Sequence, residues 1–292
     1  MRDEHPLPGT DHVVDGVRLH VVHYGSGDGL PVLLLHGFPT SSYLWRDVQR
    51  DLGPRHPTYA PDLCGLGASE RPPAGRYDHA SQAALLLSLL DALSLPKVAV
   101  VAHDVGGGVA VHLAAAAPER VAALVLLDTP LHTEVWPVPI VRLLALPVVG
   151  EAQLSAMRYV PGAGARFLGA NLARGLRATE LSPKALSHYV TPLLSADGTR
   201  GMLSLARAAD PGAVQQAFGL VCADPPPSLV LWAEQDAWFS PAYGRRVAGE
   251  LRGASYVEVA DAGHFLPEDR PERVAEEIEG FLAEIPAASP IP

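Results

Sequence analysis

The sequence predicts an α/β protein whose mostly parallel sheet is covered by helices on both faces. Short, continuous apolar runs such as PVLLL at 31–35 are typical of strands that are buried on both sides. These runs alternate along the chain with segments of helical apolar spacing, which favours a parallel sheet. The 292 residues are 48% hydrophobic and 18% charged, so the chain can enclose a large core.

The first third of the chain supplies three expected strands and one helix. Residues 17–24 read as a strand because an Asp-Gly turn precedes them. The run at 31–35 ends in His-Gly, and the short strand at 58–60 ends in Pro-Asp. Apolar residues recur at helical spacing over 81–93, which predicts the first long helix.

The rest of the expected layer continues the alternation. KVAVVA at 97–102 is a buried strand, the small residues over 105–117 indicate a helix, and 121–127 is a strand again. After a long interval the same signals return. Strands are expected at 228–232 and 255–259, and helices at 242–251 and 272–284, the last of them amphipathic.

The strand signal disappears between the two halves of this pattern. Residues 131–226 are rich in Ala, Leu, Pro and Gly at helical spacing. We therefore expect a helical cap at 131–226, inserted into a core that is formed by 1–130 and 227–292.

Charge and cysteine content exclude several classes of function. The net charge is −10 without any basic run, which disfavours binding to nucleic acid or to an anionic membrane surface. Cys64 and Cys222 cannot form a disulfide framework.

The polar N-terminus is no signal peptide, and no stretch of about 18 apolar residues exists. We expect a cytoplasmic protein without a membrane span, and its scattered histidines predict no metal site.

Four polar motifs follow predicted strands. They are HGFP at 36–39, HDVGGG at 103–108, AEQD at 233–236 and DAGHF at 261–265. Because chemistry in such sheets takes place where the strands end at their carboxyl edge, these motifs should meet.

This order of motifs resembles the α/β-hydrolase family over nearly the whole chain. The resemblance implies an α/β-hydrolase fold, with a sheet of the eight-stranded type and a helical cap. The family presents its nucleophile on a sharp strand-to-helix turn, usually G-x-S-x-G. Here the turn reads A-H-D-V-G at 102–106, with Asp104 in the serine position. No G-x-S-x-G occurs in the chain, which excludes an ordinary serine esterase, lipase or peptidase.

An aspartate at this position implies different chemistry. A carboxylate is ionised at neutral pH, so it can attack an sp³ carbon and form an alkyl-aspartyl ester without help from a base. The resemblance is then to the aspartate-nucleophile branch, the epoxide hydrolases and haloalkane or haloacid dehalogenases. It implies that His264 activates water to hydrolyse the ester. The backbone N–H groups of Phe38 and Val105 would form the oxyanion hole. No cofactor is implied.

Two aspartates compete for the role of the acid that orients His264. Asp236 follows the strand at 228–232 and precedes His264 by 28 residues, which is the common arrangement in the family. Asp128 follows the strand at 121–127, where some dehalogenases carry the acid. We favour Asp236 and keep Asp128 as the alternative.

The substrate is expected to be a small apolar organic molecule, and the leaving group decides its class. Epoxide hydrolases share HGFP and protonate the epoxide oxygen with two cap tyrosines, for which Tyr159 and Tyr189 are the candidates. Dehalogenases hold the halide with N–H donors, typically a Trp after the nucleophile and an Asn within the first motif. Val105 and Phe38 occupy those two positions here.

The indoles of Trp136 and Trp238 could supply halide donors from other positions. We favour an epoxide hydrolase, with a haloalkane or haloacid dehalogenase as the alternative. Two readings from other classes stay open: a ligand-binding receptor, or a biosynthetic cyclase or lyase, on the same scaffold.

Overall fold

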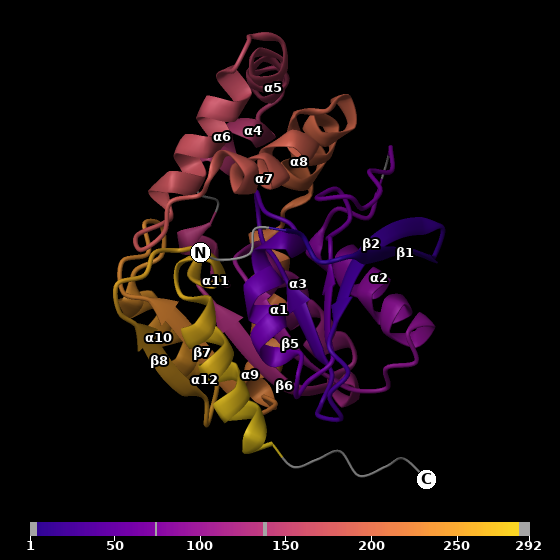
Figure 1. Cartoon of the computed structure of the whole chain (residues 1–292), viewed down its shortest axis with the longest axis vertical. Helices are drawn as coiled ribbons and strands as arrows, with labels where there is room; N and C mark the ends of the chain where they lie inside the picture. Colours follow the sequence, from indigo (N-terminus) through magenta and orange to yellow (C-terminus); the bar gives the residue numbers. More distant parts are fainter. Residues whose placement is uncertain (1–4, 74, 137–138, 286–292) are drawn as a thin grey trace.

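The computed structural model describes residues 5–73, 75–136 and 139–285. Its centre is an eight-stranded sheet with the strand order β1-β2-β4-β3-β5-β6-β7-β8 (Figure 1). The β1–β2 and β2–β4 pairs are antiparallel and all other pairs are parallel. The predicted fold class is confirmed. The strands are β1 (Gly9–Val14), β2 (Val17–Tyr24), β3 (Val32–Leu35), β4 (Thr58–Pro61), β5 (Val98–His103), β6 (Val121–Leu127), β7 (Ser228–Ala233) and β8 (Ser255–Val259).

Every residue of the central strands β3, β5 and β7 is buried. Such strands need cover on both faces, and the helices of the core supply it in two packed groups. Helices α2 and α9 both pack on α3, while α1 packs against α12. These helices are α1 (Arg46–Leu52), α2 (His79–Ala92), α3 (Val105–Ala116), α9 (Pro211–Ala223), α10 (Pro241–Glu250), α11 (Leu266–Asp269) and α12 (Pro271–Ala283).

Strand register brings the ends of the parallel strands to one edge. Leu35 at the end of β3 lies opposite Ala102 of β5. The end of β6 lies beside both β5 and β7, and the end of β7 lies beside the end of β8. The four polar motifs therefore leave the sheet at neighbouring positions.

The chain begins with a strand that the sequence analysis does not predict. β1 reads GTDHVV, and five of its six residues are exposed or only partly buried, so it lacks an apolar run. It is held by antiparallel backbone pairing with β2, from Gly9 opposite Val22 to Val14 opposite Val17. An edge strand of this kind depends on its neighbour and carries little signal of its own.

The five helices between 139 and 208 pack on one another and lie above the sheet (Figure 1). Helix α9 falls inside the expected cap range 131–226, yet it packs against α3 of the core. We therefore propose that the cap consists of the five helices alone and that α9 belongs to the core. The five are α4 (Pro139–Ala145), α5 (Val149–Tyr159), α6 (Ala163–Arg174), α7 (Pro183–Leu194) and α8 (Ala196–Ala208).

Two neighbouring carboxylates of α11 tie this cap to the core. Glu268 is buried. It accepts two hydrogen bonds from the guanidinium of Arg46 and a third from the hydroxyl of Tyr189 on α7. Asp269 accepts the backbone N–H groups of 177–179, in the chain between α6 and α7, as well as that of Gly263. One short helix thus fixes both the cap and the loop that carries His264.

None of the helices in the described residues is both long enough and apolar enough to cross a membrane.

Candidate active site

Asp104 occupies the turn between β5 and α3. Its backbone adopts φ 52° and ψ −124°, a conformation that is costly for a residue with a side chain and is found where function demands it. The turn needs small neighbours: a Cβ on Gly107 would lie 1.8 Å from the Thr129 hydroxyl oxygen, and one on Gly37 would lie 2.4 Å from Asp104. The Thr129 hydroxyl donates to the Asp104 carbonyl at 2.7 Å and holds the turn in place.

The carboxylate of Asp104 is buried, and polar groups of the protein surround it. Its residue is 7% exposed, and Oδ1 accepts the backbone N–H of Phe38 at 2.9 Å. Oδ2 lies 3.5 Å from His264 Nε2. Burial raises the pKa of this carboxyl, but His264, His103 and the Val105 N–H together lower the pKa below its ordinary value. The carboxylate is therefore ionised and faces the two N–H groups expected for an oxyanion hole.

His264 lies in the loop after β8, between two carboxylates. Its Nδ1 is 3.0 Å from Asp236 Oδ2, and its Nε2 faces Asp104. Burial alone would lower the pKa of the imidazole, but the two carboxylates outweigh it and raise the pKa to about 10. In the unreacted protein the ring is an imidazolium. Because the Asp236 contact occupies Nδ1, the other nitrogen points at the space above Asp104.

Asp236 itself is fixed by the backbone that follows it. Its Oδ1 accepts the N–H groups of Trp238 at 2.7 Å and Phe239 at 3.1 Å. His103 packs behind the turn, where its Nε2 contacts the carbonyl of His264 at 2.8 Å. Both ends of the Asp236–His264 contact are thus held independently of any substrate.

Asp128 occupies a different place from the alternative given to it in the sequence analysis. It is fully buried, and its Oδ1 accepts the backbone N–H of Ala233 at 2.9 Å. Its Oδ2 has no hydrogen-bond partner among the described donors. Burial and the charge of Asp236 raise the pKa of Asp128 well above its ordinary value. The structure brings Asp236, rather than Asp128, to the ring of His264.

A cavity of about 550 Å³ lies over Asp104 and His264, and we call it the reaction cavity. Trp136 and Trp238 both line it, together with Asn171 of α6. Neither indole N–H has a hydrogen-bond partner in the part of the chain that the structure describes. The remaining walls are apolar and include Phe38, Pro39, Val105, Val141, Leu168, Phe239 and Phe265.

The two tyrosines expected to contact the leaving group lie elsewhere. Tyr159 is 68% exposed at the end of α5, where Arg158 stacks on its ring. Tyr189 is buried, but its hydroxyl donates to Glu268 and does not line the reaction cavity. Sequence spacing does not show which face of a cap helix meets the core, so it could not place these two hydroxyls.

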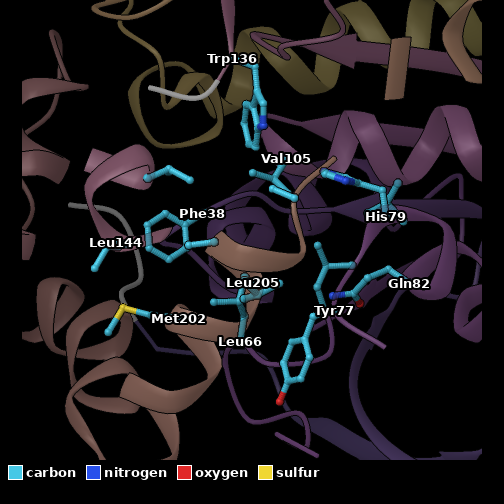
Figure 2. A pocket seen from close by; sticks show the side chains of 15 residues that line it. Phe38, Leu66, Tyr77, His79, Gln82, Val105, Trp136, Leu144, Met202 and Leu205 are labelled. Carbon is cyan, nitrogen blue, oxygen red and sulfur yellow. The ribbon is translucent and has the colours of Figure 1, made fainter. Parts of the chain in front are cut away.

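A second cavity of about 540 Å³ adjoins the first, and we call it the distal cavity (Figure 2). The two share Phe38, Val105, Trp136 and Val141 as walls. The distal cavity extends between α2 and α3 of the core and α4 and α8 of the cap; its further lining includes Leu66, His79, Val109, Leu144, Met202 and Leu205.

Asn171 and His79 are cavity residues that the sequence analysis does not single out. Asn171 lies on the same side of α6 as Leu168, three residues earlier, and its Nδ2 donates to the Phe167 carbonyl. A polar residue within an apolar helical stripe is the signal that could have found it. Within the described residues, no group of three or more His, Cys, Asp or Glu side chains could hold a metal ion.

Comparison with known proteins places the chain in a family. A family model described as alpha/beta hydrolase fold matches residues 31–271. A haloalkane dehalogenase of Bradyrhizobium diazoefficiens is 29% identical over 91% of both chains. A cis-3-alkyl-4-alkyloxetan-2-one decarboxylase of Shewanella oneidensis is 29% identical over 95% of this chain and 90% of its own.

Solved structures agree with these matches. The haloalkane dehalogenase DbeA of Bradyrhizobium elkani is 28% identical and superposes with a TM-score of 0.82, covering 97% of this chain and 99% of its own. The chain therefore belongs to the alpha/beta hydrolase fold family, and the haloalkane dehalogenases of that family are among its relatives.

Proposed function

We propose that this hydrolase cleaves carbon–halogen bonds through a covalent ester on Asp104. Oδ1 of Asp104 is held by the Phe38 N–H, so Oδ2, which faces His264, is the oxygen that attacks. Oδ2 forms a bond to the sp³ carbon of the substrate while the carbon–halogen bond breaks, and the electron pair leaves with the halide. This first step requires no base, because the carboxylate is already ionised.

The second step hydrolyses the ester. His264 takes a proton from water, and the resulting hydroxide attacks Cγ of Asp104. The charge that develops on Oδ1 is stabilised by the N–H groups of Phe38 and Val105. Collapse of this intermediate releases the alcohol and restores the carboxylate. In sum, an alkyl halide and water give an alcohol, a halide ion and a proton.

The two steps are linked through the charge of His264. The imidazolium of the unreacted protein owes its raised pKa in part to the Asp104 carboxylate. Alkylation removes that negative charge, so the pKa of His264 falls and the ring can release its proton. The base thus becomes available only after the ester has formed.

The choice of halide over epoxide rests on one observation. The polar groups on the walls over Asp104 are the unpartnered indoles of Trp136 and Trp238 and the amide of Asn171. N–H donors suit a departing halide, whereas an epoxide oxygen needs a proton, and the two expected tyrosines lie outside this cavity. The names of the dehalogenase relatives support the same choice. The epoxide preference expected from the sequence is therefore not supported.

Trapping the intermediate tests the proposal. A His264→Gln variant keeps Asp104 but lacks the base, so with 1-bromobutane it should release one bromide per protein and stop. Intact-protein and peptide mass spectrometry should then find a butyl group on Asp104. The Asp104→Ala/His264→Gln double variant is the control and should show neither bromide nor adduct.

A single turnover of the unaltered protein in H₂¹⁸O provides a second test. Label should enter the carboxyl of Asp104, because the attacking water oxygen stays on Cγ when the alcohol leaves. Label found only in the alcohol would contradict the ester route.

A second candidate function is the opening of a strained lactone with loss of CO₂. The Shewanella relative is named for a ring that carries two alkyl groups. Two apolar cavities that meet at Val105 would hold two alkyl arms on either side of the reacting atoms. An oxetan-2-one would give an alkene and CO₂ without the addition of water, so CO₂ release from this substrate would favour the second candidate. Halide release from bromoalkanes would favour the first.

We also propose the cytoplasm as the place where the protein acts. Cys64 and Cys222 are both free thiols, and neither is needed for the steps above.

A further inference from the structure

The distal cavity is lined by two polar groups without a hydrogen-bond partner among the described residues: the indole of Trp136, which the reaction cavity shares, and the imidazole of His79. Four side chains with polar atoms line it, Trp136, Tyr77, Gln82 and His79 (Figure 2). The Tyr77 hydroxyl donates to the carbonyl of Pro72 at 2.6 Å. Both polar atoms of Gln82 are bonded at 2.9 Å to the backbone of Cys64. His79 has no hydrogen-bond partner among the described residues, so apart from the Trp136 indole, which the reaction cavity shares, it is the side chain with bonding capacity to offer a ligand.

His79 is held rigidly at the cavity wall. It is only 7% exposed, and a Cβ on Gly108 would lie 2.5 Å from its ring, so the glycine makes room for it. Its ring centroid lies 6.3 Å from that of His112 and 6.2 Å from that of Trp136. Figure 2 shows His79 beside Val105, the residue next to Asp104. A ring fixed in this way can bind a ligand atom with little loss of side-chain entropy.

The electrostatic state of His79 defines what it can bind. Burial and the neighbouring His112 lower the pKa of His79 to about 4. At neutral pH the ring is therefore uncharged and has one N–H donor and one acceptor nitrogen. Such a group suits a neutral oxygen, since an anion would find no positive charge here.

The small side chain of Val105 connects this group to the reaction centre. Val105 lines the reaction cavity, the distal cavity and a third cavity of about 230 Å³ that His79 also lines. A larger residue at position 105 would reduce the space through which a bound chain can pass from Asp104 to His79. The rest of the distal wall is apolar, including Leu66, Val109 and Met202.

We propose that the distal cavity binds the arm of the substrate that extends away from the reacting carbon, and that this arm is an alkyl chain bearing one neutral oxygen that hydrogen-bonds to His79. The inference rests on the proposed function for the reacting end of the molecule. It narrows the substrate class to haloalkanes with a hydroxyl, ether or carbonyl oxygen on the remote part of the chain.

The oxygen is tested with matched pairs of substrates. ω-Bromoalkanols and bromoalkanes of equal length, from four to eight carbons, are compared by kcat/KM. At one or two chain lengths, kcat/KM for the alcohol should be about tenfold higher than for the bromoalkane. This factor is the gain expected from one additional neutral hydrogen bond. His79→Phe keeps the ring volume and should abolish this preference. His112→Phe removes a nearby imidazole that does not line the cavity, and it should retain the preference.

The apolar part is tested by filling the cavity from the cap. Each methylene added to a bromoalkane should raise kcat/KM up to about fourfold while the chain still finds apolar wall. Ala206 of α8 also lines the distal cavity. Ala206→Phe narrows the cavity and should flatten this increase for long chains. The control Ala173→Phe places the same ring on an exposed position of α6 and should leave the series unchanged.

Binding without turnover separates this inference from the proposed function. 1-Alkanols carry no leaving group, so calorimetric titration of the unaltered protein reads affinity alone. Affinity that rises with chain length, and that falls in His79→Phe and in Ala206→Phe, supports the inference even if no bromoalkane is consumed. Bromoalkane turnover that ignores chain length, oxygen and both substitutions would leave the proposed function standing and overturn the inference.

Discussion

The sheet edge and the cap meet over the same cavity but are built in opposite ways. At the sheet edge each side chain proposed for catalysis is buried and bonded: Asp104 to the Phe38 N–H, and Asp236 to two backbone N–H groups and to His264. The cap presents mostly apolar walls, and its polar cavity group Asn171 bonds only within its own helix. The difference teaches that the charged groups proposed for catalysis lie at the sheet edge, whereas core and cap together supply the apolar walls that make room for the substrate.

The strongest test of this division removes the nucleophile. Asp104→Ala should reduce halide release by about 10⁴-fold or more, because no other described carboxylate faces the cavity with His264. Halide release is measured alongside the melting temperature. Asp224→Ala, at an exposed position far from the sheet edge, should change neither. Residual turnover within tenfold of the unaltered protein would remove Asp104 from the mechanism.

Within the sheet edge, two buried acids should behave differently. Asp236→Asn loses the charge that orients His264, and a comparable change in a serine protease triad costs about 10⁴ in kcat. Asp128→Asn alters a carboxyl that bonds the Ala233 N–H instead of the ring of His264, so kcat should change less than about tenfold. Steady-state kinetics on both variants decide between the acids. Equal losses would mean that both carboxyls act on His264.

The charge of His264 should also appear in the stability of the fold. Its pKa of about 10 lies above the unfolded value of 6.5, so the imidazolium stabilises the native state. This contribution is complete below pH 6.5 and disappears as pH rises to about 10. In that window the free energy of unfolding should fall by up to about 1.4 kcal/mol per pH unit. Denaturant titrations at pH 6.5, 8 and 9.5 measure the slope, and His264→Gln should lower it; identical slopes would refute the assignment.

The smallest effect is expected where the cap is tied to the core. Tyr189→Phe removes the hydroxyl that donates to the buried Glu268, at a cost of about 1–3 kcal/mol in unfolding free energy. Tyr159→Phe alters an exposed hydroxyl and should cost less than about 0.5 kcal/mol. Neither variant should change the rate of ester formation in a single turnover. A slower first step in Tyr189→Phe would show that cap and sheet edge are less separate than their contacts suggest.

Sequence reasoning was most informative for polar residues that directly follow a buried strand. Continuous apolar runs identify β3, β5 and β7, and parallel pairing brings the residues that follow them to one edge. The positions of Asp104 and His264 could therefore be expected from their place in the chain. The choice between Asp236 and Asp128 was harder, because both follow neighbouring parallel strands and only the loop geometry turns one toward His264.

The same reasoning could not decide side-chain direction where this direction depends on how layers pack. Helical spacing shows that α9 has an apolar face but not that this face meets α3. It likewise could not tell that Tyr189 points at Glu268, or that Asn171 faces the cavity. The sequence analysis did not predict strand β1, because backbone pairing with β2 holds this strand and it has no apolar run.

The tie at α11 has a practical consequence for exchanging caps between members of the fold. Glu268 and Asp269 follow His264 by four and five residues. Glu268 accepts a hydrogen bond from Tyr189 of α7, and Asp269 accepts the backbone N–H groups of 177–179. A foreign cap that lacks the partners of these two acceptors would leave Arg46 as the partner of Glu268 and would leave Asp269 with the Gly263 N–H in place of four donors. Grafts that carry Tyr189 and residues 177–179 along with the new helices should transplant selectivity while sparing the reaction.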